Sequence, residues 1–391
     1  MIVGVPKEIH PGERRVALVP AVVPNLAKAG MEVLLETSAG VEAGYPDSAY
    51  IEKGAKIAPS REAVFSSSDI IVQVLCHGAN DVNGKDDLRR LRRGQLLFGF
   101  LRPLGTKEVV EQVAASGVTS FAVELLPRTT RAQSMDALSS MATVSGYKAV
   151  LMAANSLPRL LPMMTTAAGT ITPARVFIIG VGVAGLQAIA TARRLGAVAS
   201  AYDMRPAAKE QVLSLGGRFV ELPIEAKNAQ DARGYGSAQD EAFYAKQREL
   251  LARVVAESDV VITTAVIPGK KAPTLVTADM VKAMAPGSVI LDLAAERGGN
   301  CELTQAGKTI VTNGVTIIGE INLARTVPYH ASQMYARNVT SFLLNLVKDG
   351  KVNLNLQDEI IRDTLLTQSG EIVNARVREF LALPALATQQ G

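Results

Sequence analysis

The chain has 391 residues, which is more than one ordinary domain holds and suits two or three. Its 48% hydrophobic and 20% charged residues are typical of a globular protein and exclude an intrinsically disordered chain. With 41 Lys and Arg against 37 Asp and Glu, the net charge of +4 is too small and too evenly spread to indicate a nucleic-acid partner. Cys76, Cys301 and three isolated histidines define neither a disulfide framework nor a metal site.

The N-terminus and the longest apolar stretch predict a soluble, cytoplasmic chain. Lys7 and Glu8 place charge too early for a secretory signal peptide. The apolar stretch at 176–192 is shorter than the roughly 20 residues that cross a bilayer, and three glycines interrupt it. We therefore expect no membrane-spanning helix in this chain.

Strand-like and helix-like segments alternate along the N-terminal third of the chain. The predicted strands are residues 2–5, 32–36, 70–75, 96–101 and 120–124, and the predicted helices are residues 21–29, 61–66 and 107–115. Such alternation is typical of a parallel, doubly wound sheet. The arginines at 89–93, preceded by two aspartates, predict a short helix with acids at its start and bases at its end. No glycine-rich nucleotide motif occurs here, so this domain lacks a nucleotide signature of its own.

A long connecting helix is predicted at 139–156, before Pro158 and Pro162 break the pattern. Further strands are then predicted at residues 175–180, 197–203, 218–222, 260–265, 289–293, 309–311 and 315–319. A second long helix, at 329–347, returns the chain to the first domain. We expect an α/β protein with two doubly wound, parallel-sheet domains of Rossmann type joined by long helices: residues 1–140 with 327–391, and residues 141–326.

The most specific motif is a glycine turn between a buried strand and a helix. Gly180, Gly182 and Gly185 form Gly-x-Gly-x-x-Gly in that context. Gly180 permits the tight turn, Gly182 lets a pyrophosphate approach the backbone, and Gly185 allows close packing of the helix on the strand. The amides at the start of the helix, near Ala184, would hold the phosphates.

Asp203 ends the next predicted strand, at the spacing of roughly 20 residues that the dinucleotide fingerprint expects. Its carboxylate can accept hydrogen bonds from the hydroxyls of an adenosine ribose and would repel a 2′-phosphate. The sequence therefore predicts NAD(H) rather than NADP(H) as the bound nucleotide.

Residues 224–240 form an unusually long segment without helical or strand periodicity. Connections in α/β units are usually roughly 2–6 residues, and longer ones are often functional lids. Tyr235 between Gly234 and Gly236 resembles a mobile flap that lays a ring over a site and supplies a hydroxyl. An ordinary surface insertion is the alternative interpretation.

Polar residues directly follow the last predicted strand of the first domain, where ligands of open parallel sheets bind and where the interdomain cleft is expected. Arg128, Gln133 and Asp136, with several hydroxyls, suit the carboxamide, ribose and phosphates of a dinucleotide. A capped helix entry, with Ser134 or Asp136 as the N-cap, is the alternative, and one loop can serve both purposes.

These motifs together resemble the alanine dehydrogenase/nicotinamide nucleotide transhydrogenase superfamily. Pro-Lys-Glu at 6–8 and Glu-Arg-Arg-Val-Ala at 13–17 are shared by the superfamily. Specifically, the chain resembles the NAD(H)-binding component, domain I, of proton-translocating transhydrogenases, in residues 128–140, 180–192, 263–270, 292–294 and 298–301. The resemblance covers essentially the whole chain.

The resemblance implies a role for each matching position. Arg128, Gln133 and Asp136 would position the nicotinamide and its ribose, and Tyr235 would close over them; these four are catalytic in that positional sense only. The other implied cofactor-binding residues are Thr129, Thr130, Ser139, Gly180, Gly182, Val183, Ala184, Gly185, Asp203, Met204, Arg205, Gly234, Gln247, Ala265 and Val266.

Two positions distinguish the chain from alanine dehydrogenases. Those enzymes need a lysine and a histidine for substrate binding and proton transfer. The lysine position carries Leu75 and the histidine position carries Arg102. Arg15, which would bind a substrate carboxylate, is retained. Binding the substrate without a residue for proton transfer is insufficient for an alanine dehydrogenase, so this activity is not expected.

The resemblance therefore implies a proton-translocating, Re/Si-specific transhydrogenase subunit in which a hydride passes directly from NADH to NADP⁺ bound on a partner subunit. Such a transfer moves no separate proton, so the site needs proximity and orientation rather than an acid or base. The resemblance also implies a homodimer, an NADP(H)-binding partner, and membrane-spanning proton-channel subunits that hold the chain at the inner face of the cell membrane. An amino-acid dehydrogenase and a non-catalytic NAD(H)-binding module remain as alternatives.

Overall fold

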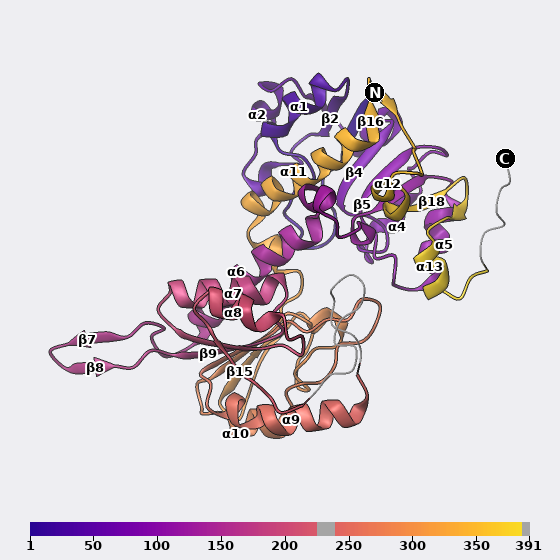
Figure 1. The fold of residues 1–391 in the computed structure, drawn as a ribbon. Coiled ribbons are helices and arrows are strands. Elements are labelled where there is room, and N and C mark those ends of the chain that lie inside the picture. Colours follow the sequence, from indigo (N-terminus) through magenta and orange to yellow (C-terminus); the bar gives the residue numbers. More distant parts are fainter. Residues whose placement is uncertain (225–238, 385–391) are drawn as a thin grey trace. The chain divides into compact units, whose positions relative to one another are not determined.

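The computed structural model describes residues 1–224 and 239–384. It divides into two compact units, Met1–Met141 with Arg325–Gly391, and Ala142–Ala324 (Figure 1). The first boundary lies within helix α6 (Ala137–Ser156). The second lies in the short 3₁₀-helix η6 (Leu323–Thr326), immediately before helix α11 (Pro328–Leu346).

The first unit is built on a sheet of eight strands in the order β19-β18-β6-β5-β4-β1-β2-β3. Their bounds are β1 Ile2–Val5, β2 Glu32–Glu36, β3 Lys56–Ala58, β4 Ile70–Leu75, β5 Leu96–Phe100, β6 Thr119–Ala122, β18 Leu365–Gln368 and β19 Glu371–Ile372. Strands β1 to β6 pair in parallel, and the winding reverses between β1 and β4. All six residues of β4 are buried, which explains why five of them are apolar; the exception, Gln73, donates a hydrogen bond to Asp87.

Short helices lie between these strands in sequence or, in the case of α13, follow the last one. Their bounds are α1 Val23–Lys28, α2 Asp47–Ile51, α3 Arg61–Ser67, α4 Gly84–Leu88, α5 Lys107–Ala115, α12 Glu359–Thr364 and α13 Ala375–Phe380. The long helix α11 packs Phe342 on the sheet, stacked on Phe98 with 4.5 Å between ring centroids. Aromatic packing of this kind ties the C-terminal part of the chain to the strands of the first hundred residues.

The C-terminal strands depart from the parallel pattern. β18 lies antiparallel to β6, with Thr367 opposite Ser120, and their hydroxyl oxygens are 2.6 Å apart. β19 continues the edge as a short hairpin with β18. The C-terminal segment therefore extends the sheet of the first unit beyond the strands that the sequence predicts.

The second unit holds a sheet of seven strands in the order β11-β10-β9-β12-β13-β15-β14. The strands are β9 Arg175–Ile179, β10 Val198–Tyr202, β11 Arg218–Phe219, β12 Val260–Thr263, β13 Val289–Asp292, β14 Thr309–Thr312 and β15 Val315–Ile318; the helices are α7 Val183–Arg194, α8 Ala208–Ser214, α9 Glu241–Ala256 and α10 Ala278–Ala283. All neighbours pair in parallel except β14, which lies antiparallel to β15 at the edge. The predicted α/β class with parallel-dominated, doubly wound sheets is confirmed.

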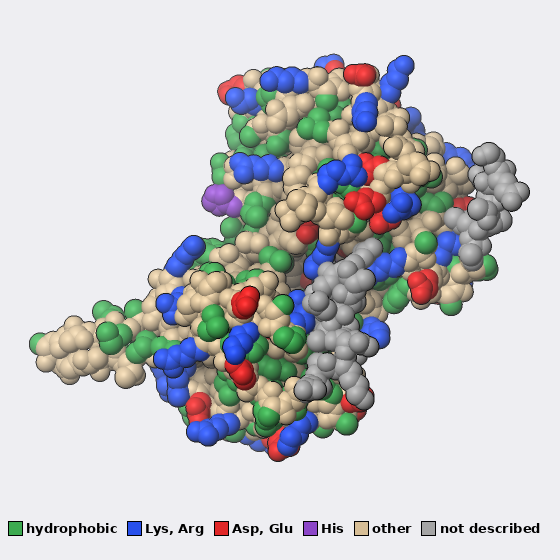
Figure 2. All heavy atoms as spheres, in the orientation of Figure 1, with side chains coloured by type: hydrophobic (Ala, Val, Ile, Leu, Met, Phe, Trp, Pro, Cys, Tyr) green, Lys and Arg blue, Asp and Glu red, His purple; other side chains and the backbone are tan. Residues whose placement is uncertain are grey.

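The second unit also contains a β-hairpin that the sequence does not predict. β7 (Met164–Thr166) and β8 (Gly169–Ile171) pair antiparallel, and the hairpin extends away from the sheet of its unit (Figure 1). All six strand residues are exposed, and residues 160–174 contain no Asp, Glu, Lys or Arg (Figure 2). The prolines at 158 and 162 indicate a break in the helix but give no sign of a hairpin beyond it.

Among the residues that the structure describes, no helix is long and apolar enough to cross a membrane.

Candidate functional site

The glycine turn follows directly from strand β9. Gly180 has φ +97°, a left-handed conformation that glycine adopts without strain. Its N–H donates to the carbonyl of Tyr202 at 2.9 Å, and its carbonyl accepts from the hydroxyl of Thr264 at 2.9 Å. A Cβ at position 180 would lie 2.6 Å from that hydroxyl oxygen. The turn is therefore closed between the ends of β10 and β12 and has no room for a side chain.

The two following glycines have different surroundings. A Cβ on Gly185 would lie 2.0 Å from the carbonyl oxygen of Gly180, so helix α7 packs against the turn itself. A Cβ on Gly182 would meet nothing within 4 Å. Gly182 is the N-cap residue of α7 and supplies no side-chain cap. The first amides of α7 therefore have an open approach without a capping side chain, as a helix N-terminus that binds phosphate requires.

A fourth glycine, absent from the predicted site, belongs to this arrangement. A Cβ on Gly146 of α6 would lie 2.1 Å from the carbonyl oxygen of Ala184, so α6 crosses the first turn of α7 at backbone contact. Val183 and Ala184, predicted to contact the pyrophosphate, lie in this first turn, with Val183 exposed. A glycine inside a helical pattern often marks close packing, and that signal could have identified Gly146.

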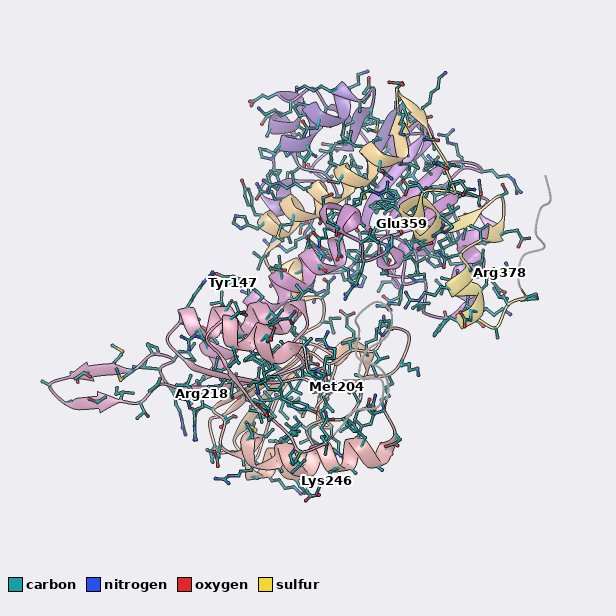
Figure 3. The ribbon with its side chains drawn as sticks, in the orientation of Figure 1. Tyr147, Met204, Arg218, Lys246, Glu359 and Arg378 are labelled. Atoms are coloured by element: carbon teal, nitrogen blue, oxygen red, sulfur yellow. The ribbon has the colours of Figure 1, made fainter. Side chains whose placement is uncertain are left out.

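Asp203 lies directly after β10 and beside the glycine turn. Its Oδ2 accepts from the N–H of Val181 at 2.7 Å, and Oδ1 accepts from the N–H of Arg205 at 2.9 Å. Arg205 also donates from Nε to Oδ1 and from Nη2 to Oδ2, both at 2.9 Å. Hydrogen bonding to Asp203 raises the pKa of the Arg205 guanidinium above its ordinary value. The residue between them in sequence is Met204, which is labelled in Figure 3 and is half-buried.

Gln247, predicted to line the cofactor site, is a buried residue of helix α9. Only 2% of it is exposed, and its Nε2 donates to the hydroxyl of Tyr202 at 3.0 Å. Burial raises the pKa of Tyr202. The Gln247 side chain therefore fixes the ring of Tyr202, the residue before Asp203. Val266 is exposed, just beyond the carboxyl end of β12.

A buried network that the predicted site residues do not include organises the loops after β12 and β13. Asp292 is fully buried and accepts from the hydroxyl of Thr263 at 2.9 Å, the hydroxyl of Thr304 at 2.7 Å and the N–H of Asn300 at 2.7 Å. The Asn300 side chain in turn accepts from the N–H of Ala265 at Oδ1 and donates from Nδ2 to the Ala265 carbonyl, each at 2.9 Å. These bonds fix the backbone at Ala265, a predicted cofactor contact.

In the first unit, the segment after β6 contains two 3₁₀-helices, η3 (Val123–Leu125) and η4 (Thr130–Met135). Asp136 then caps α6, because its Oδ1 accepts from the N–H of Ser139 at 2.9 Å and its Oδ2 from the Ser139 hydroxyl at 2.5 Å. The N-cap interpretation is confirmed for Asp136 rather than Ser134. Two predicted site residues, Asp136 and Ser139, are thus brought into direct contact.

The remaining predicted residues of this segment lie on the surface of the first unit. Arg128, Thr130 and Gln133 are exposed. Thr129 is half-buried, and its hydroxyl oxygen is buried without a hydrogen-bond partner in the described structure. Exposed cationic and amide groups at the carboxyl end of a parallel strand can bind a polar ligand.

The C-terminal segment of the chain holds η4 in place. Asn338 of α11 donates from Nδ2 to the carbonyl of Ser134 at 2.9 Å. Arg131 donates from Nη1 to Asp358 Oδ2 at 3.0 Å, and Asn345 donates to the same oxygen at 3.2 Å. The residues that contact η4 directly lie more than 200 positions away in sequence, so periodicity could not reveal them.

Gly234 and Tyr235, the predicted flap, lie outside the described residues. Within the described parts of the chain, no three His, Cys, Asp or Glu side chains gather as a metal site would require.

Comparisons with known proteins identify the same family on both units. Two family models match: "Alanine dehydrogenase/PNT, N-terminal domain" over residues 4–145 and "Alanine dehydrogenase/PNT, C-terminal domain" over residues 149–375. The chain is 44% identical to NAD(P) transhydrogenase subunit alpha of Cereibacter sphaeroides, over 95% of this chain and 71% of that protein. It is 30% identical to alanine dehydrogenase of Bacillus subtilis, over 95% and 92% of the two chains. The crystal structure of transhydrogenase from Sinorhizobium meliloti superposes with a TM-score of 0.82 at 41% identity, covering 96% of this chain and all of that one.

Proposed function

The chain belongs to the alanine dehydrogenase/PNT family, and from that premise we propose that it is the NAD(H)-binding subunit of an NAD(P) transhydrogenase. The observation that carries the proposal is the open, uncapped start of α7, with Asp203 beside it. Gly182 leaves room for a pyrophosphate against the backbone, and the amides of the first turn of α7 offer it donors. The residues present therefore fit a dinucleotide.

The preference for NAD(H) over NADP(H) follows from Asp203. Its carboxylate would accept hydrogen bonds from the adenosine ribose and repel a 2′-phosphate. Arg205, a cation that could attract that phosphate, is bonded at Nε and Nη2 to the Asp203 carboxylate. The pair is neutral overall, so it offers a 2′-phosphate no net attraction.

We propose direct hydride transfer between NADH on this chain and NADP⁺ on a partner subunit. Because a hydride moving between two nicotinamides carries no separate proton, the chain has to bind, orient and exclude water rather than act as an acid or base. Arg128, Gln133 and Asp136 would position the dihydronicotinamide end, and Asp136 is already held rigid as the cap of α6. Tyr235 would cover the site.

The partners in this proposal are a second copy of the chain, an NADP(H)-binding subunit and membrane-spanning subunits that conduct protons. The uncharged hairpin β7–β8 supports the homodimer. Met164 and Ile171 of the hairpin are 43% and 46% exposed, and Met163, directly before β7, is 63% exposed. A two-stranded hairpin is marginally stable alone, and an exposed apolar patch of this kind is typical of a protein–protein contact.

A stopped-flow experiment tests the proposal. The purified chain is mixed with NADH and an NADP⁺ analogue, with and without the NADP-binding partner. We expect rapid reduction of the analogue only when the partner is present. NADH formation from L-alanine without any partner would instead show an amino-acid dehydrogenase. NADH binding without turnover in either assay would show a binding module.

Gln133→Asn examines the positional role within the same experiment. Shortening the side chain by one methylene keeps the amide but moves it, so we expect slower hydride transfer with nearly unchanged NADH affinity. A large loss of NADH affinity would make Gln133 a binding residue instead.

A further inference from the structure

The turn between β14 and β15 in the second unit consists of two residues, Asn313 and Gly314. The residues on either side, Thr312 and Val315, pair with each other across the hairpin. Asn313 has φ +51° and Gly314 has φ +76°. Two successive positive φ values are typical of a type I′ turn, for which Asn-Gly is the favoured sequence. Turn geometry therefore explains why this pair of residues stands here.

Asn-Gly is also a chemically reactive pair. The backbone nitrogen that follows an asparagine can attack the side-chain amide carbon and close a five-membered ring. Glycine favours this step, because it has no Cβ to obstruct the approach and its backbone is the least restricted. The sequence contains two such pairs, Asn83-Gly84 and Asn313-Gly314. Their surroundings decide which of them can react in the folded chain.

The Asn313-Gly314 turn is free to change conformation. Both residues are exposed, and among the described residues the Asn313 side chain has no hydrogen-bond partner. Strand β14 lies at the edge of its sheet and is bonded to β15 alone. Ring closure requires the chain to leave the left-handed turn conformation, and opening the end of this hairpin breaks bonds between these two strands only. Such a local opening costs less free energy than unfolding the unit.

The Asn83-Gly84 pair in the first unit is held in place instead. Asn83 donates from Nδ2 to the carbonyl of Ile9 and from its N–H to Oδ1 of Asn80, both at 2.9 Å. Gly84 is the buried first residue of α4, and a Cβ there would lie 2.8 Å from Cα of His77. Neither the amide carbon nor the following nitrogen can therefore move without breaking these contacts. One chain thus contains the same reactive pair in a free and in a fixed setting.

We propose that Asn313 is a site of spontaneous deamidation, at which an exposed amide becomes a carboxylate. The backbone nitrogen of Gly314 attacks Cγ of Asn313 and forms a new N–Cγ bond, while the Cγ–Nδ2 bond breaks. The proton of that nitrogen leaves with the amino group as ammonia. Water then opens the succinimide ring at either carbonyl and yields aspartate or isoaspartate. The overall reaction consumes water and releases ammonia, with no oxidation or reduction.

The isoaspartate product should weaken the edge of the sheet. Its backbone runs through the former side chain and is longer by one carbon atom, which a two-residue turn matched to its strands does not accommodate. The Gly314 carbonyl accepts from the N–H of Gly287 at 2.7 Å, and a Cβ on Gly314 would lie 2.9 Å from Cβ of Pro286. The turn is therefore packed on the segment before β13. We expect the modified chain to lose this contact and to unfold at a lower urea concentration.

Peptide mapping of the full-length folded chain tests the inference. Samples kept in neutral and in mildly alkaline buffer are digested with trypsin after increasing times and analysed by mass spectrometry. We expect the mass change of an amide converted to an acid at Asn313, in the peptide 309–325, and a faster reaction at higher pH because the attacking nitrogen must lose its proton. Asn322 in the same peptide also has a positive φ, but Leu323 follows it, so it should stay unmodified. Asn83 should react about tenfold more slowly than Asn313, or less, because its side-chain hydrogen bond must break first.

Asn313→Gly is the matched variant, because glycine keeps the positive φ and has no amide to lose. On isoelectric focusing the wild type should accumulate an acidic form that the variant lacks. A urea-denatured sample gives the reference, in which Asn83 and Asn313 should react at similar rates. Equal rates at the two sites in the folded chain would overturn the inference, as would an Asn313 that reacts only in urea. An acidic form that accumulates equally in Asn313→Gly would place the reaction elsewhere and overturn it too.

Discussion

Asp203 and Arg205 form a two-pronged ion pair in which Nε and Nη2 of the arginine each lie 2.9 Å from a different carboxylate oxygen. Asp203, which we predict to accept hydrogen bonds from the adenosine ribose, is therefore paired with Arg205, the cation predicted to lie beside it. Arg205 Nη2 also donates to the carbonyl of Val181 at 3.0 Å, which connects the pair to the glycine turn. Nucleotide preference in this site depends on both charges together.

Asp203→Asn should change that preference. The variant loses the charge that repels a 2′-phosphate and leaves Arg205 without its counter-charge, so we expect NADPH binding to appear and NADH binding to weaken by about tenfold or more. Fluorescence titration with both reduced nucleotides measures the change. The double variant Asp203→Asn/Arg205→Met lacks the attracting cation and should not gain NADPH binding. Strong NADPH binding by the double variant would contradict this explanation.

Alanine substitutions at two glycines of the turn should separate packing from ligand binding. Gly185→Ala places a Cβ 2.0 Å from the Gly180 carbonyl oxygen, so we expect a loss of roughly 1–3 kcal/mol in the free energy of unfolding. Gly182→Ala meets no atom within 4 Å, so its unfolding free energy should change by less than about 0.5 kcal/mol. NADH affinity should nevertheless fall in Gly182→Ala, because the new methyl group obstructs the pyrophosphate. Urea denaturation and NADH titration of both variants provide the comparison.

The buried carboxyl group of Glu8 should make stability depend on pH. Burial, reinforced by the charge of Glu13, raises the pKa of Glu8 from the ordinary 4.5 to about 8, although Val74 and Leu75 donate backbone hydrogen bonds to it. At pH values between about 4.5 and about 8, Glu8 is protonated in the folded chain and ionised in the unfolded chain. The unfolded state therefore binds fewer protons, and stability falls as the pH rises through this window.

Glu8→Gln removes the titrating proton and tests this expectation. Relative to the variant, the wild type should lose stability steadily from about pH 5 to about 8 and then level off. Urea midpoints at several pH values measure the difference. Glu62→Gln, at an exposed position of α3, serves as the matched control, and its stability should depend on pH in the same way as that of the wild type. A wild-type curve parallel to that of Glu8→Gln would show that Glu8 does not titrate in this window.

A charge placed on the hairpin should prevent self-association. Ile171 is 46% exposed on β8, and Ile171→Glu would bury an unpaired carboxylate in a dimer contact, which is strongly unfavourable. We expect a dimer for the wild type and a monomer for the variant in sedimentation velocity experiments. Val311→Glu is the control, since Val311 is 68% exposed on the edge strand β14. Dissociation by the control variant, or a dimer that survives Ile171→Glu, would place the contact elsewhere.

Much of the fold could be read from the sequence because its central strands are buried on both faces. Every residue of β4, β12 and β13 is buried, and each strand contains a single polar residue among apolar ones, a pattern that local sequence identifies. The short strands β18 and β19 carry no such signal, since β18 pairs with β6, far away in sequence, and β19 joins the sheet only through β18. The predicted short helix is present as α4, with Asp86 and Asp87 in its first turn, but it ends at Leu88, so Arg89 is its C-cap residue and the other arginines lie beyond it.

The sequence by itself determined the glycine turn and the acid after β10, because each depends on conformations and spacings within about 25 residues of chain. Only the tertiary structure decided which distant segments pack against the predicted residues. In the second unit it brings Gly146 against Ala184, and in the first it brings Asn338 to the carbonyl of Ser134. The physical reason is that close approach and hydrogen bonding between distant segments depend on how helices and strands pack, and no local periodicity records that packing.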